Sequence, residues 1–165
     1  MGLNQTIIAE LQQEANTTRK LLERVPEGAL GWKPHEKSMT LARLASHVAE
    51  LCGFIELILK QDELDFASGD YKPFVATNVA ELLERFDKNI STAKDLLKSA
   101  TDEQLMKSWR MRQGERVFFE LPRIAVIRSM ALNHVIHHRG QLSVYLRLQD
   151  VPLPSIYGPS ADEPM

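Results

Sequence analysis

The sequence predicts an all-α protein, a four-helix bundle with a small β-hairpin before the last helix. Four long stretches repeat apolar residues at steps of three and four, which is the period of an amphipathic helix. Each stretch has one apolar face, and four such faces can be buried together only as a bundle. The chain has 165 residues, a length that fits one domain, so we expect a single domain over residues 1–165.

The first two helices are expected in the first 58 residues. The apolar repeat predicts a helix over Leu3–Arg24, ended by Pro26. Ser38 or Thr40 can cap the second helix, which should extend to about residue 58. His47 lies in the middle of the apolar face of this second helix, so it should point into the core.

A loop and a third helix follow. Residues 65–75 contain Gly69 and Pro73 and are expected to form a loop across one end of the domain. Residues 78–81 resemble a capping box and open the third helix, which continues to about Leu97. Residues 101–104 form a second cap pattern, which precedes a short helical turn.

The last part of the chain is predicted to form a hairpin and the fourth helix. Between Trp109 and Pro122 apolar residues alternate around a turn at residues 113–115, which indicates a β-hairpin. The helical period returns from Arg123 to about Asp150. Gly140 in this helix costs about 1 kcal/mol of helix propensity, which is tolerable if a neighbouring backbone packs closely against it. The pattern leaves the order and direction of the helices open.

The fourth helix carries three histidines within five residues. His134 and His138 are four residues apart, so in a helix they share one face and can bind the same ion. A lone inward histidine is usually a packed core residue with a hydrogen-bond partner. Two buried imidazoles at this spacing favour a metal site, because one ion satisfies both nitrogens. The third, His137, could instead pair with His134 at a spacing of three.

Composition excludes several classes of function. A formal net charge of −2 with mixed signs gives no basic field of the kind that nucleic-acid binding needs. The chain has no long apolar window and does not begin like a secretion signal, so we expect a cytoplasmic protein without a membrane partner. Its one cysteine, Cys52, excludes an intrachain disulfide and is expected to pack in the core rather than to bind a metal.

Several motifs, in this order and spacing, resemble those of the DinB/YfiT-like superfamily. They are Leu-x-x-His (Leu44–His47), His-x-x-x-His-Arg-Gly-Gln (His134–Gln141), Tyr-Leu-Arg (Tyr145–Arg147) and Pro-x-x-Tyr-Gly-Pro (Pro154–Pro159). The resemblance spans nearly the whole chain. It implies an up-down-down-up four-helix bundle, often a homodimer, with a divalent ion bound by three histidines near one end.

Transferred residue by residue, the resemblance implies that the metal ligands are His47, His134 and His138. The family pattern and the inward face favour His138 over His137. Imidazole ligands suit Zn, Ni, Cu or Fe, and of these we expect Zn or Ni. Glu50, three residues after His47, is a candidate to accept a hydrogen bond from it and orient it. Arg128, Arg139 and Arg147 are expected to face outward, with Arg139 in a surface or inter-helix salt bridge.

The resemblance also implies a thiol-dependent S-transferase or isomerase that uses glutathione, mycothiol or bacillithiol. Its partners would be a small-molecule thiol and an electrophilic substrate, because a metal cation can deprotonate a bound thiol near neutral pH. One alternative is a metal-dependent hydrolase, although no acidic residue follows either histidine as in His-Glu-x-x-His helices. Another is a non-catalytic dimeric metal-binding stress-response protein. Three ligands argue against that last alternative, because structural zinc sites usually have four.

Overall fold

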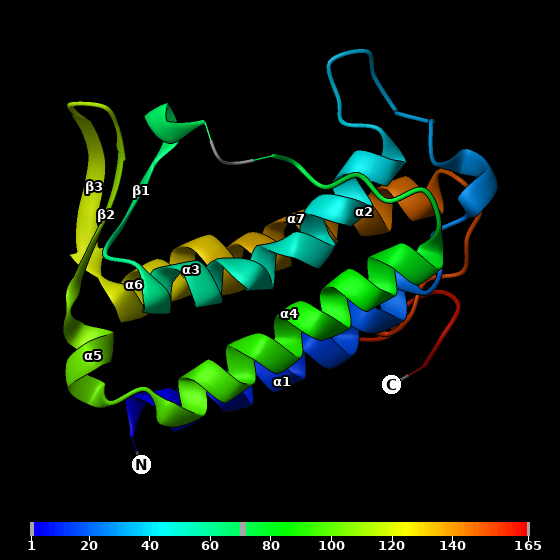
Figure 1. The fold of residues 1–165 in the computed structure, drawn as a ribbon. Coiled ribbons are helices and arrows are strands. Elements are labelled where there is room, and N and C mark those ends of the chain that lie inside the picture. The colour runs from blue at the N-terminus through cyan, green and yellow to red at the C-terminus, as the bar shows by residue number, and fades with distance from the viewer. Residues whose placement is uncertain (1, 70–71, 165) are drawn as a thin grey trace.

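The computed structural model describes residues 2–69 and 72–164, and these form a four-helix bundle (Figure 1). Its helical elements are α1 (Leu3–Leu22), α2 (Leu41–Glu50) continued by α3 (Phe54–Lys60), α4 (Val79–Ser99), and α6 (Arg123–Ile127) continued by α7 (Asn133–Arg147). In Figure 1, α1 and the α6–α7 pair run in one direction. The α2–α3 pair and α4 run in the opposite direction, and a long return connection joins α3 to α4. This is the up-down-down-up order that the resemblance implied.

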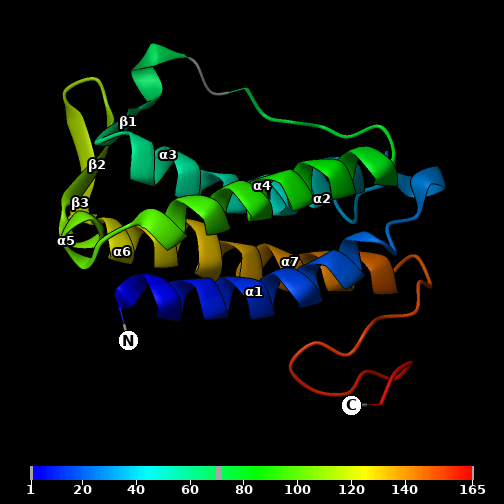
Figure 2. The same cartoon turned by 60° about the horizontal axis from the view of Figure 1, so that its bottom comes forward.

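The helices pack so that α2 lies between two partners. It contacts α4 on one side and α7 on the other, and α1 packs mainly against α4 and also against α7 (Figure 2). The long connection from α3 back to α4 is what allows α2 and α7 to be neighbours. The three predicted metal ligands lie on these two helices.

The first helices begin and end close to their predicted limits. α1 ends at Leu22, two residues before the predicted Arg24. Thr40, not Ser38, caps α2: its hydroxyl accepts a hydrogen bond from the backbone N–H of Arg43 at 3.2 Å. The predicted single second helix is interrupted by a 3-10 turn over Leu51–Gly53, and α3 then completes it.

The helix caps predicted in the second half of the chain are present, with one difference in their hydrogen bonds. The Asn78 side chain accepts from the N–H of Glu81 at 2.9 Å, as a cap does. The Glu81 carboxylate, however, bonds the backbone and hydroxyl of Thr77 rather than closing a capping box with Asn78. The box predicted at Thr101 and Gln104 is confirmed, and it opens the short helix α5 (Asp102–Met106).

A three-stranded sheet lies at one end of the bundle. β2 (Ser108–Gln113) and β3 (Arg116–Pro122) form the predicted hairpin, with Gly114 at a positive φ of 58° in the turn. β1 (Glu63–Asp65) pairs in parallel with β2 and was not predicted, because its partner is distant in sequence. Part of the predicted loop at residues 65–75 is instead a 3-10 turn over Phe66–Ser68; residues 70 and 71 lie outside the described chain.

The last helix contains a π-helical turn that the sequence did not predict. Residues Arg128–Leu132 form it between α6 and α7, directly before the histidine-rich stretch. A π turn holds more residues than an α turn, so it rotates the following residues relative to the preceding ones. The helix that was predicted over residues 123–150 is therefore two α segments, and α7 ends at Arg147.

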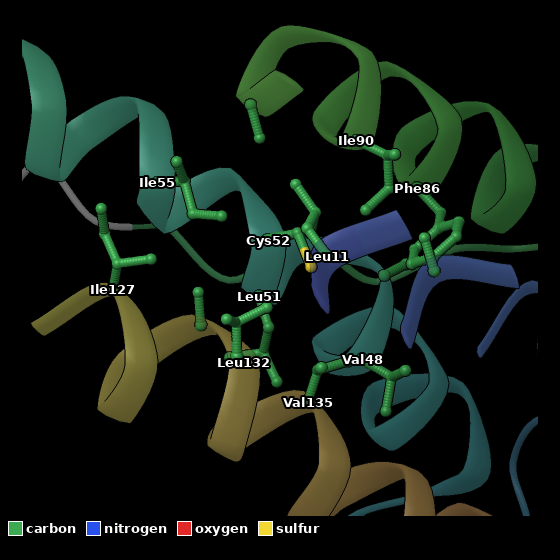
Figure 3. Packing of buried hydrophobic residues seen from close by; sticks show 14 of the residues in the cluster. Leu11, Val48, Leu51, Cys52, Ile55, Phe86, Ile90, Ile127, Leu132 and Val135 are labelled. Carbon is green, nitrogen blue, oxygen red and sulfur yellow. The ribbon is translucent and has the colours of Figure 1, made fainter. Parts of the chain in front are cut away.

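The buried core lies between the helices and includes the cysteine. Figure 3 shows Cys52 among apolar side chains such as Leu11 and Leu51. The thiol is buried, and burial raises its pKa to about 12. The prediction that Cys52 is a packing residue is confirmed.

A buried ion pair joins α1 to α7 and to the C-terminal segment. The Arg139 side chain is 2 % exposed, and its Nη2 lies 2.7 Å from Oε2 of Glu14. Its Nη1 donates to the Thr18 hydroxyl at 3.1 Å. The Tyr157 hydroxyl donates to the same Glu14 oxygen at 2.7 Å, and the guanidinium lies over the Tyr157 ring. The inter-helix salt bridge predicted for Arg139 is confirmed, but the expectation that Arg139 faces outward was wrong.

Replacing Glu14→Gln should strongly destabilise the fold, because it leaves the buried Arg139 charge without its counter-charge. We expect the free energy of unfolding to fall by about 3 kcal/mol in urea titrations. Glu10→Gln is the matched control. Glu10 also joins α1 to the last helix, by an ion pair with Arg128, but that pair is exposed and its loss should cost at most about 1 kcal/mol. Equal losses in the two variants would contradict the role given to the buried pair.

Gly140 lies on the exposed face of α7, and a Cβ added there would meet no atom within 4 Å. Close packing of a neighbouring backbone, the condition under which the cost of Gly140 would be offset, is therefore not seen at this position. Gly140→Ala should raise the free energy of unfolding by about 0.5 to 1 kcal/mol, because alanine has the higher helix propensity. Gly53→Ala is the control: its Cβ would lie 3.2 Å from the Asn89 side chain, so it should gain less. A larger gain at Gly53 would refute this comparison.

Candidate metal centre

The structure brings His47, His134 and His138 together between α2 and α7. One nitrogen from each ring can be chosen so that all three lie within 4.8 Å of one another. The ring centroid of His47 is 5.1 Å from that of His134 and 4.6 Å from that of His138. Among the described residues, no carboxylate or thiol joins this group. We call these three residues the three-His group.

Each ring of the three-His group has a hydrogen-bond partner on its far side. His47 Nδ1 lies 3.1 Å from Oε1 of Glu50, and His138 Nδ1 lies 2.7 Å from Oε1 of Gln141. Both oxygens can only accept, so both Nδ1 atoms carry the proton. His134 bonds the backbone of Met130, one turn earlier, in a contact that favours its protonated form and so identifies the carbonyl as acceptor.

Fixing these tautomers leaves lone pairs that point at one another. With Nδ1 protonated, the Nε2 atoms of His47 and His138 are free to donate an electron pair. The Nε2 atoms of His134 and His138 are 2.9 Å apart. Two donors bound to one zinc ion at 2.0–2.1 Å lie roughly 3 Å apart. The His134–His138 pair therefore has the spacing of two ligands of one ion, with His47 close by and with acceptors behind the rings of the kind that orient metal-binding histidines.

The local electrostatics favour the neutral forms of His134 and His138, and the neutral imidazole is the form that binds a metal. Burial, with repulsion from the neighbouring rings, lowers the pKa of His134. Burial lowers the pKa of His138 to about 4, against the effect of its hydrogen bond to Gln141. A second proton therefore binds weakly to the His134 and His138 rings at neutral pH.

His137 lies outside the three-His group. It is exposed, and its Nε2 faces Nε2 of Gln141 at 3.2 Å. The Gln141 amide therefore donates to His137 while its oxygen accepts from His138. His137 therefore contacts Gln141 from an exposed position, on the amide nitrogen and not on the oxygen that accepts from His138. The geometry places His138, not His137, beside His47 and His134; the assignment of the three as metal ligands stays a prediction.

A second layer of polar contacts holds Glu50. Arg43 donates to the same Glu50 oxygen as His47, at 2.8 Å, and the backbone N–H of Phe74 donates to the other oxygen at 3.2 Å. Arg43 also donates to the Phe74 carbonyl at 3.2 Å. These donors outweigh burial and lower the pKa of Glu50. The predicted contact between Glu50 and His47 is confirmed, and Glu50 is an ionised acceptor rather than a base with a raised pKa.

Sequence reasoning missed three participants. It gave no role to Gln141, although Gln141 follows His138 at the same spacing of three by which Glu50 follows His47. Arg43 lies one turn before His47 on the same helix face, and nothing else in the sequence indicated that it contacts Glu50. The carbonyl of Met130 lies in the π-helical turn, which the sequence did not predict.

A family model described as the DinB superfamily matches residues 10–142, which include all three histidines. The chain belongs to the DinB superfamily. A relative of the chain, the YrdA protein of Bacillus subtilis strain 168, is 25 % identical over 153 residues, covering 91 % of this chain and 85 % of YrdA.

Solved structures of DinB-like proteins share the fold. The Bacillus subtilis protein YjoA superposes with a TM-score of 0.68 at 21 % identity, covering 90 % of this chain and 95 % of YjoA. YfiT of Bacillus subtilis superposes with a TM-score of 0.63 at 15 % identity, covering 89 % and 87 % of the two chains. YfiT is described as a probable metal-dependent hydrolase with an unusual four-helix bundle topology. In the described part of this DinB chain, none of the helices has the length and apolar character to cross a membrane.

The metal-free protein should lose stability as the pH falls from 7 to 5. The pKa of His138 is about 4 in the folded state and near 6.5 in an unfolded chain, so the unfolded state binds more protons between these values. After discounting for partial solvent screening, we expect a loss of about 1 kcal/mol in urea titrations of chelator-treated protein.

The variant His138→Gln should show a shallower dependence over this pH range, and His35→Gln, at an exposed position, should keep the wild-type dependence. An unchanged slope in His138→Gln would show that His138 is not the titrating group.

Proposed function

We propose that this protein is a divalent-metal-dependent enzyme in which His47, His134 and His138 hold the ion, and that it transfers groups to or from a small thiol. The observation that carries the proposal is the convergence of three imidazoles that each have an oxygen acceptor behind the ring. Three ligands leave at least one position open, as in catalytic zinc sites. Zn or Ni is the proposed ion, because both accept imidazole ligands.

The protein residues would prepare this centre before any substrate binds. A divalent ion bound there supplies Lewis-acid chemistry that lowers the pKa of a coordinated thiol or water, so that the nucleophile is available near neutral pH. Glu50 and Gln141 fix the tautomers of His47 and His138. Arg43 balances the charge of Glu50, so the three neutral ligands leave the positive charge of the ion undiminished.

Thiol transfer is favoured over hydrolysis by the state of Glu50. A hydrolytic reaction is helped by a general base that takes a proton from water. Glu50 contacts a predicted ligand, but its lowered pKa and its bonds to His47, Arg43 and Phe74 leave it a weak base. A thiol is far more acidic than water and needs no such base. Metal-dependent hydrolysis is the second candidate, because YfiT, which shares the fold, is described as a probable metal-dependent hydrolase.

The first test is metal content, measured by mass spectrometry on protein purified without an affinity column. We expect about one divalent ion per chain in the wild type and loss of the ion in His47→Ala, His134→Ala and His138→Ala, because each removes a ligand. His137→Ala is the matched control and should keep most of the metal. Wild-type protein that contains no metal and takes up none would refute the proposal.

Activity then separates the two candidates. A thiol transferase should shift the absorption spectrum of the Co(II) form when its thiol binds, and its turnover should require that thiol. A hydrolase should cleave activated esters or amides without thiol. In either case His134→Ala should lower kcat/KM by about a hundredfold or more, since it removes a ligand of the catalytic ion.

A further inference from the structure

A hollow lies beside the three-His group, between the start of α2 and the second half of α7. Its volume is about 440 Å³. It is bordered by Gln141, the acceptor for His138, and by Leu44, which precedes His47 by one helical turn. The hollow therefore meets the three-His group through Gln141, which bonds Nδ1 of His138, and none of the three histidines is among its lining residues. Its size is within the range of small-molecule sites.

Part of the wall of the hollow is apolar and exposed, whereas Lys37, Ser38 and Gln141 are its polar members. Met39 and Val144 line it and are 38 % and 58 % exposed, although neither is polar. Tyr145 forms a further wall. Its hydroxyl donates to the Met39 carbonyl at 3.3 Å, and its ring meets Trp32 edge-on at 5.6 Å between centroids. These contacts hold the wall in place, so exposed apolar surface is presented next to the centre.

One positive charge lies at the rim. Lys37 lines the hollow, and within the described residues its Nζ has no hydrogen-bond or ion-pair partner. The first backbone amides of α2 are not free to bind an anion: the N–H groups of Leu41 and Ala42 donate to the carbonyls of Trp32 and Leu30. The side-chain donors that line the hollow include Lys37, Ser38 and Gln141, and of the lining residues Lys37 is the one with a positive charge.

A second hollow, next to the Glu50 acceptor of His47, is a weaker candidate. It is bordered by Glu50 and has a volume of about 170 Å³. Its polar member, Glu50, already accepts from His47, Arg43 and Phe74. A larger hollow of about 530 Å³ lies farther along, between α3 and β1, and contains none of the acceptors of the three-His group.

We propose that the hollow between Lys37 and Gln141 binds the electrophilic substrate, which has an apolar body and an anionic end directed at Lys37. This inference rests on the proposed function, because it assumes that the reacting part of the substrate lies at the three-His group. The apolar walls suit the electrophile better than a polar cellular thiol. The body of the substrate would lie against Met39, Val144 and Tyr145.

The test uses 3-phenylpropionate as probe and its neutral amide, 3-phenylpropanamide, as comparison. Binding is followed by the fluorescence of Trp32, which contacts the wall of the hollow and reports without a metal. We expect the carboxylate to bind at least about fivefold more tightly than the amide, as expected for one partly exposed ion pair. Trp32→Phe should abolish the signal change.

Three variants locate the binding. Lys37→Glu should weaken the binding of 3-phenylpropionate by about fivefold or more and should leave the binding of the amide almost unchanged. Lys88→Glu makes the same charge change on the exposed face of α4 and should have no effect. Val144→Trp places a large ring in the hollow from an exposed position and should weaken both probes. Equal binding of 3-phenylpropionate to wild type, Lys37→Glu and Val144→Trp would overturn the proposal.

Measuring both metal-free and metal-loaded protein separates this inference from the proposed function. Metal uptake without saturable probe binding would refute the proposal that the hollow binds the substrate, and it would not affect the proposal that the three-His group binds a metal. Saturable, Lys37-dependent binding in a protein that takes up no metal would support the hollow as a site and refute the metal-dependent reaction.

Discussion

The contact between α2 and α7 is the interaction on which the rest of the structure depends. It places three imidazoles in a space with little water, and each buried polar nitrogen must then find a partner. The far nitrogens are satisfied by a carboxylate, a side-chain amide and a main-chain carbonyl. The near nitrogens face one another, with Nε2 of His134 and Nε2 of His138 2.9 Å apart. A buried ion pair, between Glu14 and Arg139, joins α7 to α1.

Much of this could be predicted from local patterns. The period of three to four residues located all four helices, and alternation located the hairpin, because both are set by neighbours in sequence. The spacing of His134 and His138 gave their common face, and the apolar surroundings of His47 gave its inward direction. The family motif added the direction of the helices and the choice of His138 over His137, neither of which periodicity alone could supply.

What could not be predicted depends on contacts between distant segments. β1 is too short to show alternation and exists because β2 lies beside it. The π-helical turn has no residue signature in this chain, yet it supplies the carbonyl that His134 bonds. Arg139 looked like a surface residue because its partners, Glu14 and Tyr157, come from opposite ends of the chain. Charge on a helix does not reveal whether a distant acidic residue will be buried with it.

The topology of the chain also sets when the centre can form during synthesis. His47 lies in the second helix, whereas His134 and His138 lie in the last, after the long return connection and the hairpin. A nascent chain on the ribosome therefore exposes a single imidazole from this centre until nearly the whole sequence has emerged. The Tyr157 contact with Glu14 adds a tie that only the completed C-terminal segment can make. Formation of the three-His group is thus coupled to synthesis of the last helix, and a chain that stops before His134 cannot form it.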